Sequence, residues 1–130
     1  MKIPHASFRL LFFQVGSKPQ QTLGANGWVA GLVCAFPRET VAIYRLVKSG
    51  RIDEAVAIYR WFLPILELDI NPQLVQNIKL AEKLTGLGTE HVRPPRQPLS
   101  GAERERVLKI LEDGLAVRPV LPDYLQLEVY

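Results

Sequence analysis

Gly24-Ala-Asn-Gly-Trp-Val-Ala-Gly-Leu-Val-Cys-Ala-Phe-Pro37 is the most informative stretch of this chain. A short apolar run between glycines that leads directly into a helix is typical of a parallel strand buried on both faces. We therefore expect a strand over 28–33. The small residues Ala30 and Gly31 would let another group approach the backbone of this strand closely.

Two helices are expected directly after this strand. Pro37 suits the first turn of a helix because its absent N–H is not needed there, and Gly50 would end that helix. Asp53 can cap the next helix, which would run to about Leu68 with a kink at Pro64. The first of these helices has a broad apolar face made of Val41, Ile43, Tyr44, Leu46 and Val47.

Two more helices follow the same rules. One is predicted to open at Asn71-Pro72, a cap followed by a first-turn proline, and to stop at Gly86. Residues 87–99 form a proline-rich loop. The spacing in Ser100-Gly-Ala-Glu103 is that of a capping box, and the helix that it opens would run to Gly114.

Composition excludes several functional classes. The chain has 130 residues, 48% of them hydrophobic, and a net charge of +3, which is ordinary for a globular protein. Its basic residues are interleaved with acidic ones, so we expect no nucleic-acid partner. No apolar run is long enough for a membrane span, and the N-terminus lacks the cleavage site of a signal peptide. We expect a cytoplasmic protein with no membrane partner.

Potential ligands for metals and cofactors are sparse. The two histidines, His5 and His91, are far apart, and the single cysteine, Cys34, excludes both an internal disulfide and a cysteine-based zinc site. We therefore predict no metal site and no cofactor. Cys34 could have a lowered pKa beside a helix N-terminus, but the preferred interpretation is a small buried hydrophobe. His91 is expected to be solvated, and Arg93 and Arg96 could bind an anion or pair with a helix.

A series of sequence landmarks follows the opening stretch in a fixed order. They are Gly50-Arg-Ile-Asp-Glu-Ala55, Leu63-Pro-Ile-Leu66, Asn71-Pro72, Arg93-Pro94-Pro95 and Pro98-Leu-Ser100. This series resembles the C-terminal portion of the dihydrodipicolinate synthase / N-acetylneuraminate lyase family, which is a family of Schiff-base aldolases and dehydratases. The chain departs from the family pattern at Cys34, where an asparagine is usual, and at Gln76, where a lysine is usual.

The resemblance implies a fold class and a domain organisation. The family fold is an α/β (β/α)8 barrel, which needs about 250 residues. By this resemblance the chain would carry barrel strand eight and helix eight in 24–50 and a C-terminal helical extension in 51–118. Residues 1–23 would be an atypical N-terminal segment, and 119–130 a tail. As an isolated chain it would be mostly α.

The resemblance also implies a chemistry. Family members join a lysine amine to the keto carbon of pyruvate or a related 2-keto acid, and the Schiff base then serves as an electron sink. The lysine and a proton-shuttling tyrosine lie on strands that this chain is not expected to contain. Val15-Gly-Ser-Lys18 is superficially like the lysine strand, but Lys18 is too close to Gly24 for the βαβ unit that must separate them. We therefore expect no catalytic residue.

Two residues of the expected strand match positions in the wall of the family's substrate pocket. The backbone of Val29 would face the bound keto acid, and the small size of Gly31 would leave room for the distal part of the substrate. The alternative, which we prefer for both residues, is a role in the core of the strand alone.

Three functions remain open from the sequence. The chain could be a truncated lyase that is inactive alone, a non-catalytic assembly or binding module, or one half of a split lyase. The last two interpretations imply self-association or a partner that supplies the other barrel half, because exposed apolar faces and open strand edges associate readily.

Overall fold

The computed structural model of the protein describes residues 30–128. Over these residues the secondary structure is entirely helical. In chain order it consists of η1 Leu32–Cys34, α2 Pro37–Lys48, α3 Ile52–Leu66, η2 Glu67–Asp69, α4 Leu74–Thr85 and α5 Gly101–Ala116, where η denotes a 3-10 turn. The prediction that the chain is mostly α is confirmed for this range. The expectations for Lys18 and Val29, and for segment 1–23 as a whole, lie outside it.

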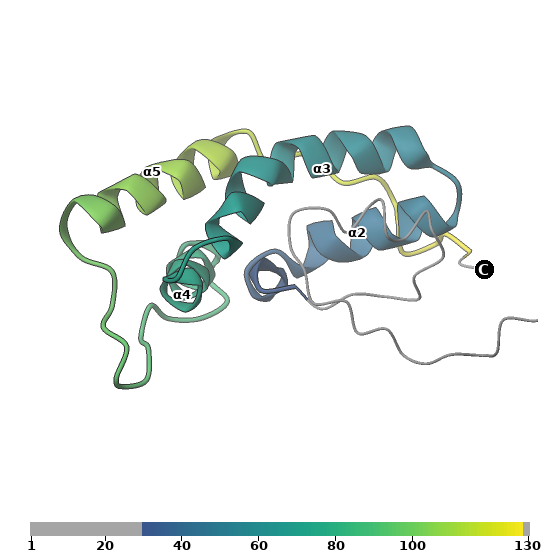
Figure 1. Ribbon diagram of the computed structural model, residues 1–130. Coiled ribbons are helices and arrows are strands. Elements are labelled where there is room, and N and C mark those ends of the chain that lie inside the picture. Colours follow the sequence, from purple (N-terminus) through teal and green to yellow (C-terminus); the bar gives the residue numbers. More distant parts are fainter. Residues whose placement is uncertain (1–29, 129–130) are drawn as a thin grey trace, which may run out of the picture.

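Helix α3 connects the other helices (Figure 1). It lies side by side with α2 and also packs against α5. Helix α4, seen end-on in the figure, contacts α5, η1 and η2. The chain beyond α5 returns toward α2.

The predicted strand over 28–33 is wrong in the part that the structure describes. Gly31 has helical backbone angles, and Leu32–Cys34 form the turn η1. The backbone N–H of Cys34 donates to the carbonyl of Gly31, and that of Phe36 to Leu32. A strand must have its N–H groups satisfied by a neighbouring strand, and no strand is present in residues 30–128. Hydrogen bonds within the turn therefore take the place of the inter-strand hydrogen bonds of a sheet.

Helices α2 and α3 agree with the sequence in position and differ in detail. Helix α2 begins at Pro37, and Gly50 beyond its end has a φ of 80°. Arg51, and not Asp53, occupies the N-cap of α3, because the helix begins two residues earlier than predicted. Val41 is exposed and does not belong to the buried face of α2. Helix α3 ends at Leu66, and its end and η2 bend toward α4 in Figure 1.

The boundaries of α4 and α5 show where capping patterns mislead. The regular part of α4 begins at Leu74, after a turn in which Asn71 Oδ1 accepts the N–H of Gln73 at 2.7 Å. Gly86 ends α4 with a φ of 76°, as predicted. Ser100 does occupy the N-cap of α5, but it forms no side-chain capping bond, so the predicted capping box is absent.

Gly114 does not end α5, which continues to Ala116. Its role is close packing against α3. A Cβ at Gly114 would stand 2.6 Å from Ile65 Cδ1, and the Gly114 carbonyl accepts the indole N–H of Trp61 at 2.8 Å. The glycine was therefore misread as a stop signal because its function depends on a residue in another helix.

The core lies between η1, α2, α3, α4 and α5. Its fully buried members include Leu32, Phe36 and Leu111. Phe36 meets the rings of Trp61 and Phe62 edge-on, with centroid separations of 5.8 and 5.2 Å. Phe62 is thus part of the buried core, and Trp61 is partly buried against it.

The tail after α5 packs on the core without regular structure. Tyr124 is buried, and Leu121 and Leu127 pack against the core. Arg45 of α2 donates to the carbonyls of Leu125 and Leu127 at 3.2 and 3.4 Å. Across residues 30–128, no helix is both long and apolar enough to cross a membrane.

Candidate functional site

The described member of the predicted pocket wall is Gly31, at the N-cap of η1. It lies against two residues of its own chain. A Cβ at this position would stand 2.7 Å from Ile78 Cδ1 and 2.9 Å from Asp69 Oδ1. The expected close approach to Gly31 is therefore confirmed, and the approaching groups come from α4 and η2.

Asp69, the last residue of η2, connects this turn with η1. Its Oδ2 accepts the backbone N–H of Leu32 at 3.3 Å. Burial raises the pKa of the Asp69 carboxyl, while the nearby backbone N–H groups of Leu32 and Gly31 act in the opposite direction. Its Oδ1 is buried and has no hydrogen-bond partner in the described part of the chain.

Asn77 of α4 binds the backbone of η2. Its side chain is fully buried, and its Nδ2 donates to the carbonyl of Leu68 at 2.9 Å. Three elements thus meet at Gly31: η1 supplies the backbone, η2 the carboxylate, and α4 both Ile78 and the amide that holds η2.

Asp69 and Asn77 were not predicted from the sequence. The available signal was an acid between two large apolar residues, Leu68-Asp69-Ile70, directly after a helix. An acid in such a place is either exposed or bound to something, and the sequence does not identify a donor that lies 37 residues earlier.

A second buried carboxylate joins α2 to the tail. Glu39 is 1% exposed, and its Oε1 accepts a hydrogen bond from Arg118 Nε. The Arg118 guanidinium also lies over the Phe36 ring, 5.7 Å from its centroid. Glu39 lies in the first turn of α2, where the helix dipole favours an acid, and its partner Arg118 is distant in sequence.

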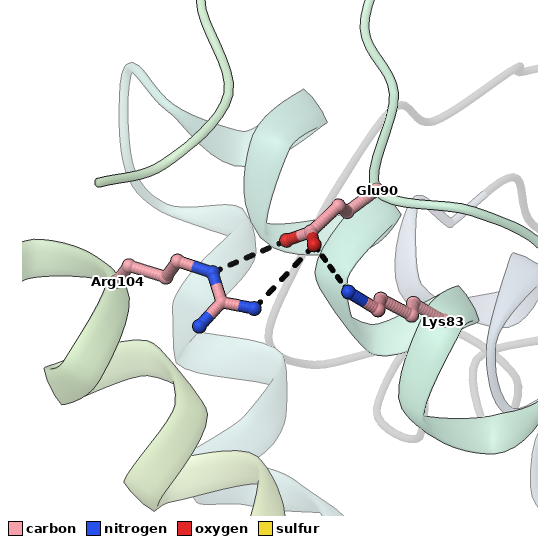
Figure 2. A network of polar contacts seen from close by, with 3 residues as sticks. All are labelled: Lys83, Glu90 and Arg104. Carbon is pink, nitrogen blue, oxygen red and sulfur yellow. Dashed lines mark hydrogen bonds and ion pairs between the residues drawn. The ribbon is translucent and has the colours of Figure 1, made fainter.

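A network of three charged residues holds the loop before α5 (Figure 2). Glu90 receives the Lys83 ammonium from α4 and the Arg104 guanidinium from α5, the latter at 3.2 Å to Oε2. Both donors lower the pKa of Glu90. Arg93 and Arg96 were considered from the sequence as residues that pair this loop with a helix, and both are exposed. Glu90 makes that pairing instead.

The remaining candidates are exposed. Cys34 is exposed, so the preferred interpretation of a buried hydrophobe is wrong; η1 turns its side chain outward, which a buried strand would not. His91 is exposed, as predicted. Among residues 30–128, no group of three or more histidine, cysteine, aspartate or glutamate side chains could hold a metal ion.

The comparisons with known proteins agree on one family. A model of the dihydrodipicolinate synthetase family matches residues 15–114 of the chain. The chain belongs to this family, which confirms the membership predicted from its sequence landmarks. The family fold is the (β/α)8 barrel.

Three relatives show how much of the family length is present. The 4-hydroxy-tetrahydrodipicolinate synthase 1 of Halalkalibacterium halodurans is 32% identical over 92 residues, which cover 71% of this chain and 31% of the relative. An uncharacterized DapA-like lyase of Pyrobaculum islandicum is 35% identical over 106 residues, 73% of this chain and 35% of the relative. The 4-hydroxy-tetrahydrodipicolinate synthase of Geotalea daltonii is 24% identical over 99 residues, with 73% and 33% covered.

The chain therefore spans about a third of the length of the curated relatives it matches. No solved structure gives a significant match.

Proposed function

We propose that this chain forms the C-terminal helical part of a pyruvate-handling Schiff-base lyase and that residues 1–130 alone do not catalyse the reaction. The observation that carries the proposal is the family match over residues 15–114, a range that contains α2, α3, α4 and most of α5. In this proposal α2 corresponds to barrel helix eight, and the later helices to the C-terminal extension.

The proposal gives Gly31 and Val29 a limited role. Both would form pocket wall through their backbone, because neither has a group that titrates or attacks a carbonyl. The side of Gly31 that a Cβ would occupy is taken by Ile78 and Asp69, so the substrate would meet the opposite side. The Schiff-base lysine would come from another part of the lyase.

Reductive trapping tests the proposed inactivity. The purified 130-residue chain is incubated with pyruvate and borohydride and then weighed by mass spectrometry, with the Halalkalibacterium halodurans synthase as the positive control. We expect an adduct on the control and none on the chain. A stable pyruvyl adduct that disappears in the Lys18→Arg variant would overturn the proposal, since it would show a working Schiff-base lysine.

A second candidate function, a non-catalytic assembly module that associates with copies of itself, is favoured by apolar side chains at the start of α4. Ile70 and Leu74 are 58% and 38% exposed, and Leu74 lies one turn before Ile78. Exposed apolar surface of this kind favours association. Size-exclusion chromatography with light scattering at low micromolar concentration tests self-association, and a clean monomer would argue against it.

A further inference from the structure

We propose that Asp69 is a positioning residue that holds the backbone of Gly31 and Leu32 in the orientation needed for a pocket wall, and that Asn77 fixes the turn from which Asp69 acts. This inference rests on the proposed function, because a wall requires a pocket. It goes beyond that function in assigning the wall's orientation to the helical extension and not to a neighbouring strand.

The first step is the contact between η2 and η1. The N–H of Leu32 would donate to an adjacent strand in a sheet, and here it donates to Asp69 Oδ2 at 3.3 Å. A hydrogen bond to a charged acceptor is roughly twice as strong as a neutral one. A single carboxylate thus orients the backbone at the point where η1 begins.

The second step is the support of Asp69 itself. Asn77 is fully buried, and its Nδ2 donates to the carbonyl of Leu68, the residue before Asp69. Its Oδ1 has no partner within residues 30–128. Because a half-satisfied buried amide is costly, an apolar residue would serve packing better, so the amide is best explained by its hold on η2.

The third step explains the glycine. Any side chain at position 31 would begin within 3 Å of both Ile78 Cδ1 and Asp69 Oδ1, which is closer than van der Waals contact allows. Asp69 can therefore approach the η1 backbone only if residue 31 is glycine. Gly31, Asp69 and Asn77 therefore act together. Gly31 leaves room for the carboxylate, Asp69 accepts the backbone N–H of Leu32, and Asn77 binds the turn that carries Asp69.

Amide hydrogen exchange in the whole 130-residue chain tests the positioning role of Asp69. Exchange of the Leu32 N–H is measured by NMR in the wild type, Asp69→Ala, Asp69→Asn and Glu67→Ala. Glu67 is the matched control, because it is an exposed acid on the same turn. Loss of a hydrogen bond to a charged acceptor should raise Leu32 exchange by about tenfold or more in Asp69→Ala.

The conservative variant separates positioning from packing. Asp69→Asn keeps an acceptor oxygen, so it should return Leu32 exchange to within about threefold of the wild type. Exchange of the Leu111 N–H, in the buried face of α5, reports whether each variant is folded. If Leu32 exchanges in Asp69→Ala as slowly as in Glu67→Ala, or if Asp69→Asn behaves like Asp69→Ala, the proposed role is wrong.

These readouts require no substrate, so the two proposals can fail separately. A pyruvyl adduct on the chain would overturn the proposed function while leaving the Leu32 result intact. An unresponsive Leu32 N–H would overturn the positioning role whether or not an adduct forms.

Discussion

Gly114 and Gly31 mark two close contacts in this molecule that are built from different groups. At Gly114, α5 packs on the fully buried Ile65 of α3, and the Trp61 indole N–H donates to the Gly114 carbonyl. At Gly31, the neighbouring groups are the Ile78 side chain and the Asp69 carboxylate, which accepts the backbone N–H of Leu32.

The difference shows what each contact contributes. The Gly114 contact removes apolar surface from water and therefore stabilises the fold. The Gly31 contact buries a carboxyl group, which costs stability, and in return it fixes the direction of a short backbone segment. We expect the first contact to dominate stability and the second to dominate local geometry.

Truncation of the two isoleucines should have the largest effect. Ile65→Ala removes a fully buried side chain and should lower the free energy of unfolding by about 3 kcal/mol. Ile78→Ala removes a partly buried one and should cost about 1 kcal/mol. Urea unfolding followed by circular dichroism measures both. Equal costs would contradict the distinction between the two contacts.

Alanine at the two glycines should reverse this order. Gly31→Ala meets two neighbouring groups and should cost about 2 kcal/mol, whereas at Gly114 the gain in helix propensity, about 1 kcal/mol, offsets part of the clash. Ile78→Val and Ile65→Val remove the respective Cδ1 atoms and should relieve part of each cost. Double-mutant cycles from urea unfolding check this, and additive costs would mean that the isoleucines are not responsible.

The pH dependence of stability should identify the carboxylate at Gly31. The pKa of Asp69 is raised in the folded state, so the folded chain holds this proton more tightly than the unfolded chain. Its contribution to stability is therefore present below the unfolded value of 3.8 and is lost as pH rises through the folded pKa. The free energy of unfolding of Asp69→Asn relative to wild type should accordingly increase with pH. A difference that is constant from pH 3 to 7 would exclude this cause.

Glu90 should give a smaller effect of opposite sign. Lys83 and Arg104 lower its pKa in the folded state, so its contribution is present above the unfolded value of 4.5 and is lost as pH falls through the folded pKa. Because the network is largely solvated, Glu90→Gln should cost only about 0.5 kcal/mol at pH 7. Urea unfolding in low and high salt checks this, since added salt should reduce the cost.

The helices could be predicted from sequence, and the contacts between them could not. Pro37, Gly50 and Gly86 marked helix ends correctly because their effects on the backbone are local. Ser100 misled because a capping residue at the right spacing need not form the capping bond, and Asp53 misled because it lies inside α3, in its first turn. Gly114 was taken for a stop because its reason lies in Ile65, far away in the sequence.

The candidate site was anticipated only in part. The sequence identified Gly31 as a point of close approach, and family membership followed from the order of the landmarks. It did not identify Asp69, whose partner is distant, nor the turn η1, whose residues alone favour a strand. The assignment of Val29 and Gly31 to a pocket wall stays a prediction.

Short-range rules were thus sufficient for the four helices of residues 30–128, because every helical hydrogen bond joins residues only a turn apart. The path of residues 30–36, the partners of Asp69 and of Glu39, and the packing at Gly114 were decided by tertiary structure. Each depends on groups that meet only after folding, because Leu32 and Asp69 are separated by 37 positions in the sequence and Glu39 and Arg118 by 79. Hydrogen bonds and burial over such separations have no local sequence signal.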